Sequence, residues 1–277
     1  MSDFRLKVFQ SVAKNLSFTK ASQELFVSQP AITKHIQELE ATYQTRLFDR
    51  QGSKISLTES GRLLLEHCER ILEDYKRLEY EMHLLHNEYI GELKLGASTT
   101  IAQYVLPPLL GSFIGKFPQV NLSLLNGNSR EIEAALQEHR IDLGLVEGVF
   151  RLPNLKYTTF LEDELVAVVH SKSRLQLPEE ITPQDLPAIP LVLRERGSGT
   201  LDVIERSLQK HGVKLSSLQV LMYLGSTESI KLFLENSDCM GIVSIRSICK
   251  ELAAGTFRVV EIKDMPMLRD FCFVQLQ

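Results

Sequence analysis

The spacing of apolar positions divides the chain into two stretches. Up to about residue 88, apolar residues recur at steps of three and four, which is typical of amphipathic helices. After residue 91, short apolar runs alternate with helical patterns, which indicates strands joined by helices and a parallel sheet. The pattern predicts an N-terminal helical part followed by an α/β part.

The first residues predict a small helical core. One face of a first helix is apolar, and it consists of Leu6, Phe9, Val12, Ala13 and Leu16. Ser17 and Ser28 are suited to cap two further helices, because their hydroxyls can accept from free backbone N–H groups. The apolar positions of these two helices are Phe18, Ala21, Leu25, Ile32, Ile36 and Leu39. We therefore expect three short helices that pack on one another.

The helix after Ser28 has a polar outer face that can contact DNA. Gln and Thr side chains can hydrogen-bond base edges, and Lys can reach phosphate or guanine. Such groups on the N-terminal half of a helix suit the major groove. The candidate DNA-binding residues of this helix are Ser28, Gln29, Pro30, Thr33, Lys34 and Gln37. An ordinary surface helix in a small domain is the alternative that this face alone leaves open.

A two-stranded hairpin is expected directly after these helices. Residues 49–54 read as a turn, and Ile55 and Leu57 alternate as in a half-buried strand. Arg50 and Lys54 flank the tip, where they could lie along a phosphate backbone or in a minor groove. We count both among the candidate DNA-binding residues.

A heptad pattern runs from Thr58 to about Glu88. Its apolar positions alternate by steps of four and three, which predicts a long helix with one apolar stripe that needs a partner. These positions are Leu64, Cys68, Ile71, Tyr75, Leu78, Met82 and Leu85. We expect the same helix of a second copy to be that partner, through Leu64, Ile71, Tyr75, Leu78, Met82 and Leu85. Packing within its own domain is the alternative.

Charge supports a nucleic-acid partner for the first part only. Residues 1–58 hold eight Lys/Arg and five Asp/Glu, a net charge of +3, whereas the whole chain carries −4. The excess is small, so affinity for random DNA should be modest and sensitive to salt. No apolar run is long enough to span a membrane, and the N-terminus has no apolar signal segment. We expect a cytoplasmic protein with no membrane partner.

Several segments together resemble the winged helix-turn-helix of LysR-type transcriptional regulators. They are Phe-Thr-Lys-Ala-Ser-Gln-Glu-Leu (18–25), Ser-Gln-Pro-Ala-Ile-Thr-Lys-His-Ile-Gln-Glu-Leu-Glu (28–40), Leu-Phe-Asp-Arg (47–50) and Leu-Thr-Glu-Ser-Gly (57–61). The resemblance implies a multidomain protein: an N-terminal all-α winged helix-turn-helix, a long linker helix, and a C-terminal α/β two-lobed, periplasmic-binding-protein-like effector domain. The family usually continues with another helix beyond the point where this chain stops.

The domain boundaries follow from this resemblance and the change of pattern. We place the DNA-binding domain at 1–58, the linker helix at 59–89 and the effector domain at 90–277, with lobes 90–161 with 266–277 and 162–265. Strands are expected at 92–98, 120–125, 141–146, 155–160, 164–170, 191–193, 219–224 and 241–244. Helices are expected at 100–117, disturbed at Pro107-Pro108, and at 130–139, 201–211 and 226–235. The chain should cross between lobes near 160–163 and 265–271.

A small-molecule site is expected between the lobes. Ligands of open α/β sheets bind beyond the carboxyl ends of strands, at helix N-termini. The candidate effector-binding residues are Ser98, Thr100, Asn128, Glu147, Thr200 and Ser226. Each Ser or Thr could instead be only a helix cap. Arg151, Arg194 and Arg196 favour a small anionic metabolite, whereas Glu147, unless it is paired, would favour a cationic or amine-bearing effector.

The expected function is sequence-specific transcriptional regulation, in which an effector changes oligomer geometry on the promoter. The partners are double-stranded DNA, the effector, a homodimer or homotetramer and, as for other regulators, RNA polymerase. A solute-binding protein is disfavoured by the helical head. An enzyme is disfavoured because no nucleotide-binding or nucleophile motif is present. No cofactor or metal is expected, since neither the four cysteines nor His83, His86 and Glu88 suggest a complete ligand set.

Overall fold

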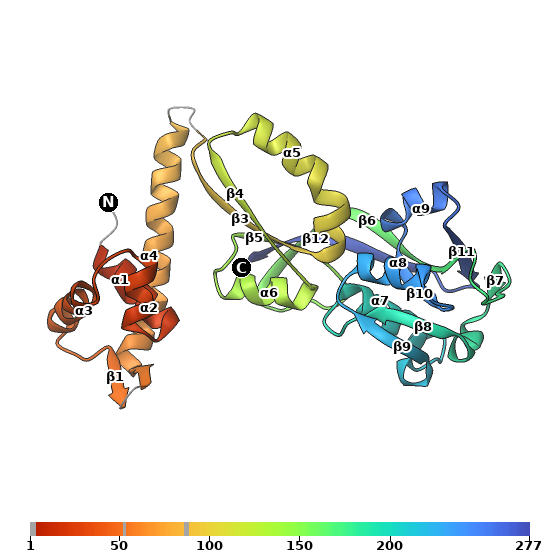
Figure 1. The fold of residues 1–277 in the computed structure, drawn as a ribbon. Coiled ribbons are helices and arrows are strands. Elements are labelled where there is room, and N and C mark those ends of the chain that lie inside the picture. The colour runs from red at the N-terminus through yellow and green to blue at the C-terminus, as the bar shows by residue number, and fades with distance from the viewer. Residues whose placement is uncertain (1–3, 52–53, 86–88) are drawn as a thin grey trace. The chain divides into compact units, whose positions relative to one another are not determined.

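The computed structural model describes residues 4–51, 54–85 and 89–277 (Figure 1). The chain forms two compact units, Met1–Ile90 and Gly91–Gln277, which we call the head and the regulatory unit. No helix in the described part of the chain is long and apolar enough to cross a membrane.

The head is built from helices around one apolar core. Its helices are α1 (Phe4–Asn15), α2 (Phe18–Glu24), α3 (Gln29–Tyr43) and α4 (Glu59–Leu84). Three expected caps are present: the side chains of Ser17, Ser28 and Thr58 accept from the N–H groups of Lys20, Ala31 and Gly61. The expected apolar stripe of α3 is buried, and it consists of Ile32, Ile36 and Leu39.

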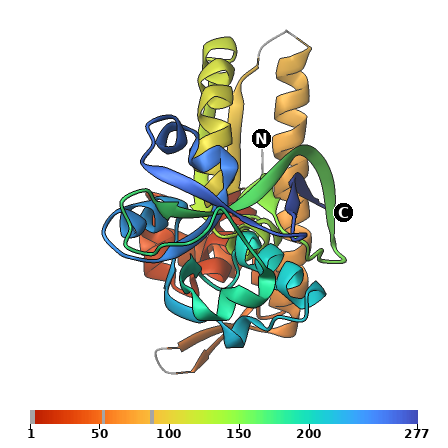
Figure 2. The ribbon, with the colours of Figure 1, turned by 90° about the vertical axis from the view of Figure 1, so that its right-hand side faces the viewer.

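The helices are followed by an antiparallel hairpin, β1 (Phe48–Gln51) and β2 (Lys54–Leu57). Figure 2 shows this hairpin projecting from the helical part of the head. Phe48 lies in the core against Phe9 and Phe18. The side chains of Arg50 and Lys54, at the predicted wing, lie outside the described residues. The strand pairing therefore establishes the wing, and the role of these two cations stays a prediction.

The first turns of α4 belong to the core of the head. Cys68 and Leu72 are buried there, and Leu64 packs against the same cluster. Gly61 permits this packing, because a Cβ at that position would lie 2.1 Å from the carbonyl oxygen of Leu47. Leu64 therefore differs from the rest of the predicted pairing stripe, since it already contacts its own domain. The exposed part of the stripe begins at Ile71.

The regulatory unit contains a 10-stranded sheet whose main path is β4-β3-β5-β12-β6-β10-β8-β9. The strands of the first lobe are β3 (Gly91–Ser98), β4 (Val120–Gly127) and β5 (Leu143–Glu147). Those of the second lobe are β7 (Glu180–Ile181), β8 (Pro190–Arg194), β9 (Gln219–Leu224), β10 (Met240–Ser244) and β11 (Phe257–Ile262). Within each lobe β3 pairs parallel with β4 and β5, and β8 with β9 and β10, as the strand–helix alternation predicts.

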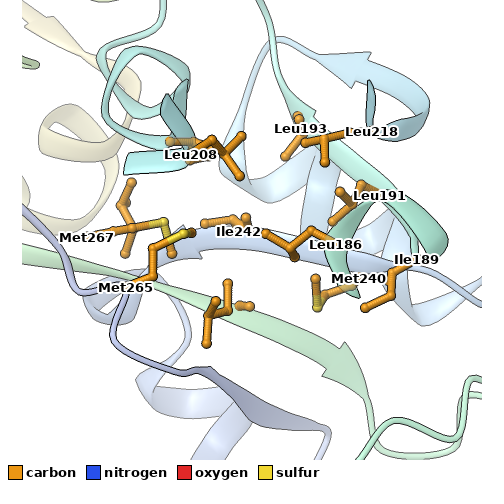
Figure 3. Close-up of a cluster of buried hydrophobic side chains, with 14 of the residues drawn as sticks. Leu186, Ile189, Leu191, Leu193, Leu208, Leu218, Met240, Ile242, Met265 and Met267 are labelled. Atoms are coloured by element: carbon orange, nitrogen blue, oxygen red, sulfur yellow. The ribbon is translucent and has the colours of Figure 1, made fainter. Parts of the chain in front are cut away.

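Helices pack on the sheet in both lobes. The helices are α5 (Leu106–Lys116), α6 (Ser129–Gln137), α7 (Gly199–Lys210), α8 (Thr227–Glu235) and α9 (Cys249–Ala253). Helices pack on both faces of the sheet in the second lobe, whereas in the first lobe α6 packs on one face and only the start of α5 packs on the other. In the second lobe, Leu191, Leu193 and Ile242 face the larger core with α7 (Figure 3). Val192 and Val243 are the sequence neighbours of these residues, and they face the opposite core under α8. This period of two follows from the pleat of a strand that is buried on both sides.

Two long strands connect the lobes, which corrects the sequence expectation. The predicted separate strands at 155–160 and 164–170 are one strand, β6 (Leu155–His170), and it pairs antiparallel with β12 (Met267–Leu276). The expected crossings near 160–163 and 265–271 therefore lie largely within paired strands. The pattern suggested a break because 162–164 is a run of three carboxylates.

Three further elements differ from the expectation. The helix expected at 100–117 begins as a π-helical turn, Ile101–Val105, so its disturbance precedes the prolines, which occupy the first turn of α5. The strands β7 and β11 and the short helix α9 were not predicted. β7 and α9 are only two and five residues long, which leaves too little periodicity to detect.

Candidate DNA-binding face and ligand pocket

The N-terminal half of α3 presents a polar, exposed face. The residues predicted for DNA contact lie on it: Ser28, Gln29, Pro30, Lys34 and Gln37 are exposed and Thr33 is half-buried. The hydroxyl of Thr33 donates to the carbonyl oxygen of Gln29 at 3.1 Å, which orients its methyl group and lone pairs. Lys34 has no ion-pair partner among the described residues. The side chains of Gln29, Lys34 and Gln37 form no hydrogen bond or ion pair within the described part of the chain, so they are available to a groove.

The carboxylates of α3 are held away from this face. Glu40 accepts a hydrogen bond from the backbone N–H of Leu47 at 2.8 Å, so it fastens the helix to the start of the hairpin. Glu38 lies 3.4 Å from Nδ1 of His35. Both lie in the C-terminal half of α3, where their negative charge repels a phosphate at the N-terminal end least.

A cavity of about 360 Å³ lies between the lobes of the regulatory unit. It lies at the carboxyl ends of β3, β4, β8 and β9, where the strand order predicts a ligand. Its lining consists of Thr99, Gln103, Asn126, Gly127, Asn128, Glu131, Glu195, Gly225 and Ser226. We call this cavity the inter-lobe pocket.

The inter-lobe pocket contains polar atoms that the protein itself does not satisfy. The hydroxyl of Thr99 and the carbonyl oxygen Oε1 of Gln103 are buried and have no hydrogen-bond partner. Two helices also begin at the pocket: Asn128 caps α6 and Ser226 caps α8. Buried polar atoms are nearly always hydrogen-bonded, so these groups indicate a site for a polar ligand or for water.

The structure divides the six predicted effector residues into two groups. Asn128 and Ser226 line the pocket while also capping their helices. The other four, Ser98, Thr100, Glu147 and Thr200, are buried and do not line it. The strand ends were located correctly, but three of these four side chains are used by an internal network. The pocket residues that were not predicted have no distinctive local pattern, and they are Thr99, Gln103, Asn126, Gly127, Glu131, Glu195 and Gly225.

The internal network is centred on Arg269 of β12. Its guanidinium bonds to Asp163 of β6 at 2.8 Å and donates to the hydroxyl of Thr200 at 2.8 Å. The same nitrogen that donates to Thr200, Nη1, lies 3.5 Å from the carboxylate of Glu147, which in turn accepts from the hydroxyl of Ser98. Glu147 is therefore paired with a cation, so its charge does not favour a cationic effector over an anionic one. These five residues connect both lobes with both crossing strands.

Other contacts also cross between the lobes. Tyr104, in the π-helical turn, donates a hydrogen bond to Glu228 at the start of α8. Glu228 also accepts from Lys231 at 2.9 Å. Burial, and then the bond to Glu228, raise the pKa of Tyr104, so its hydroxyl stays protonated and donating. At the start of α7, a Cβ on Gly199 would lie 1.9 Å from the carbonyl oxygen of Glu147, so only glycine permits this approach.

The three arginines expected near the cleft have different surroundings. Arg194 is buried, with Nε and Nη2 bonded to the carboxylate of Glu195 at 2.8 and 3.0 Å. Arg151 lies over the ring of Tyr157 and lines a separate cavity of about 410 Å³. Arg196 is exposed. Of the three, only Arg194 adjoins the inter-lobe pocket.

Cysteines and candidate metal ligands do not form a further site in the part of the chain that the structure describes. Cys68, Cys239 and Cys272 are buried and Cys249 is exposed, all as free thiols. No cluster of three or more metal-ligating side chains occurs among the residues described. Of the three residues His83, His86 and Glu88, the last two lie outside the described residues.

A winged helix-turn-helix with an exposed polar helix, combined in one chain with a two-lobed ligand-binding unit, defines a ligand-responsive DNA-binding regulator. Residues 4–62 match the family described as bacterial regulatory helix-turn-helix protein, lysR family, and residues 86–277 match LysR substrate binding domain. The chain therefore belongs to the LysR family of transcriptional regulators and is not an enzyme.

Individual relatives agree with this assignment. The chain is 29% identical to the HTH-type transcriptional regulator CysL of Bacillus subtilis, over 97% of this chain and 89% of CysL. Full-length CbnR in complex with its target DNA has the same fold, with a TM-score of 0.64 at 23% identity over 100% of this chain and 94% of CbnR. The regulatory domain of Synechocystis CcmR in complex with 2-PG gives a TM-score of 0.60 at 28% identity, over 67% of this chain and 88% of that domain.

Proposed function

We propose that α3 reads an operator through Gln29, Thr33, Lys34 and Gln37. The observation that carries this proposal is the exposed polar face of α3, whose own carboxylates are engaged elsewhere. Amide and hydroxyl groups at this end of a recognition helix can form hydrogen bonds with base edges, and Lys34 can reach a guanine or a phosphate. Arg50 and Lys54 of the wing would add contacts to the DNA backbone.

The inter-lobe pocket would be the effector site, and a small anionic metabolite its ligand. The two helix N-termini at the pocket and the unsatisfied hydroxyl of Thr99 support this choice. The CcmR domain, which shares this fold, binds 2-PG. The effector would alter the lobes, and that change would reach the spacing of the two heads on the promoter.

Self-association would use the exposed stripe of α4. Ile71, Leu78, Met82 and Leu85 are 41–76% exposed on one helix, and an apolar stripe of this kind needs a partner helix. A second copy supplies it, and two heads imply a roughly two-fold symmetric operator. We propose that the homodimer or homotetramer acts in the cytoplasm and contacts RNA polymerase at the promoter.

The test is a mobility shift with DNA upstream of the protein's own coding region, with random DNA as competitor at two salt concentrations. Tight binding that resists the competitor is the expected result. Gln29→Ala or Thr33→Ala should weaken discrimination by about 1–3 kcal/mol for a good base contact. Lys54→Ala should weaken binding to all sequences and flatten its salt dependence. Equal losses on operator and random DNA for Gln29→Ala and Thr33→Ala would overturn the assignment of base-reading residues.

The pocket has its own test in a matched pair of threonines. Thr99 lines the pocket, whereas Thr100 is equally unsatisfied but does not line it. Thr99→Val should weaken the response of operator binding to the effector, and Thr100→Val should leave it unchanged. An equal effect of both substitutions would count against this pocket as the effector site.

A further inference from the structure

The inter-lobe pocket has no basic side chain in its lining, although a guanidinium lies directly behind its wall. Its lining contains two carboxylates, Glu131 and Glu195, and no Lys, Arg or His. The guanidinium of Arg194 is bonded to Glu195 and also donates to the carbonyl oxygen of Gly225 at 3.3 Å. Both of these residues line the pocket.

Arg194 is incompletely satisfied in this arrangement. Only 1% of the residue is exposed, and its Nη1 is buried without a hydrogen-bond partner. A buried charged donor without a partner is costly, so the site gains from any acceptor that can reach it.

Glu195 is an exchangeable partner for this guanidinium. Its side chain is 26% exposed, whereas that of Arg194 is only 1% exposed, so Glu195 has a route to water that Arg194 lacks. The bidentate geometry that it adopts is the one that a carboxylate, sulfate or phosphate adopts on arginine. The carboxylate of Glu195 thus occupies the position that a ligand anion would need.

Glu131 has a different function in the same pocket. Its carboxylate accepts from the N–H of Asn128 at 2.8 Å and completes the capping box of α6. The positive end of that helix offsets its charge, and Glu131 forms no bond to Arg194. Displacement of Glu131 would therefore release no cation.

We propose that the effector is a small oxyanion, carrying a carboxylate, sulfate or phosphate group, that displaces Glu195 and binds Arg194 in its place. The inference rests on the inter-lobe pocket being the effector site and adds the ligand class and the residue that gates it. Glu195 occupies the guanidinium when no ligand is bound. The apparent affinity of the protein for the anion is therefore the intrinsic affinity multiplied by the fraction of molecules in which Arg194 is free.

The experiment compares Glu195→Gln with Glu131→Gln in the full chain. Both substitutions remove one negative charge from the pocket, and glutamine keeps the capping box at 131. Thermal unfolding is followed against sodium sulfate, sodium phosphate and sodium glycolate, with methylammonium chloride as the cation probe. Sodium chloride holds the ionic strength constant, so that screening does not contribute.

Glu195→Gln should bind at least one of the three anions about tenfold more tightly than the wild type, because it frees Arg194 in most molecules. Glu131→Gln should change the affinity by less than about threefold, the size of a screened charge effect. Equal tightening by both variants would overturn the displacement of Glu195. Stabilisation by methylammonium alone, or no response of either Glu195→Gln or the wild type to the anions, would overturn the ligand class.

The same proteins are assayed for operator binding by mobility shift. Operator binding that persists while the anion response fails overturns only the present inference. If the wild type itself does not bind the operator, the proposed function is contradicted instead.

Discussion

Arg269 and Asp163 face each other across the two strands that connect the lobes, with Nε of the arginine 2.8 Å from the carboxylate. Both side chains are completely buried. Asp163 also accepts from the hydroxyl of Ser244 at 2.7 Å, at the end of β10. A charge pair at this point holds the crossing strands and the second lobe in one arrangement.

Arg269→Met should destabilise the regulatory unit by about 3–5 kcal/mol, because it leaves Glu147 buried without a cation and Asp163 with only Arg246, at 3.5 Å. The measurement is urea unfolding of the full chain followed by circular dichroism. Arg151→Met is the control, since Arg151 is exposed and lies over the ring of Tyr157. Similar midpoints for the two variants would show that the buried network contributes little.

Tyr104→Phe removes the hydroxyl that connects the two lobes by its hydrogen bond to Glu228. We expect a loss of about 0.5–1.5 kcal/mol, the usual net value of one hydrogen bond. We also expect faster proteolysis within residues 99–105, because the π-helical turn loses its contact with α8. Tyr223→Phe, on a tyrosine that is 45% exposed, is the control and should change neither quantity. Unchanged proteolysis in Tyr104→Phe would mean that other contacts hold the lobes together.

Glu133→Gln should alter how stability depends on pH. Burial raises the pKa of Glu133 above its ordinary 4.5 and outweighs the hydrogen bond from Tyr157. Well below pH 4.5 the carboxyl is protonated in both the folded and the unfolded state, so its burial carries no charge penalty. As pH rises through the window up to the raised pKa, the unfolded state releases the proton first and the folded state loses stability.

The glutamine variant lacks this penalty. Its free energy of unfolding should therefore exceed that of the wild type by more at pH 7 than at pH 4. Chemical denaturation at both pH values measures the difference. A difference that is constant with pH would rule out a raised pKa at this position.

The thiols should react according to burial. Burial raises the pKa of Cys68 to about 12, and its Sγ donates to the carbonyl oxygen of Leu6 at 3.3 Å. Only a minute fraction is then thiolate, the reactive form, at pH 8. We expect Cys249, which is exposed, to be alkylated by iodoacetamide in the native protein before Cys68, Cys239 and Cys272. Mass spectrometry of the peptides gives the order, and early labelling of Cys68 would contradict it.

Leu78→Asp should prevent self-association through α4. Leu78 is 53% exposed in the stripe, so the substitution does not disturb the core of the head. Leu63→Asp is the matched control, because Leu63 is 60% exposed on the same helix but lies outside the heptad positions. Light scattering should give a smaller mass for Leu78→Asp only. The same mass for both variants would exclude the stripe as the pairing surface.

Local features of this protein could be predicted from the sequence because their causes are local. A cap requires a hydroxyl within three residues of a free N–H, as at Ser17, Ser28 and Thr58. The buried stripe of α3 depends only on the helical period. The pairing of the first strands and the position of the pocket also followed, since parallel α/β units place their strand ends at one edge.

Contacts between distant segments could not be predicted in this way. Asp163 is the middle residue of a carboxylate run that resembles a solvated surface, and only its register with a strand 106 residues later buries it against Arg269. Likewise, nothing local distinguishes the hydroxyl of Ser98, which bonds to Glu147, from that of Thr99, which faces the pocket. That difference depends on the pairing of β3 with β5, which brings Glu147 beside Ser98.

The crossing strands also determine how the lobes can move. β6 and β12 remain paired from Leu155↔Leu276 to Leu165↔Met267, with one irregularity at Phe271/Cys272. A rotation of one lobe must therefore twist this two-stranded ribbon, which bends most easily at its irregularity. Twisting paired strands costs free energy, so a ligand that rotated the lobes would have to bind the rotated arrangement more tightly by at least that amount.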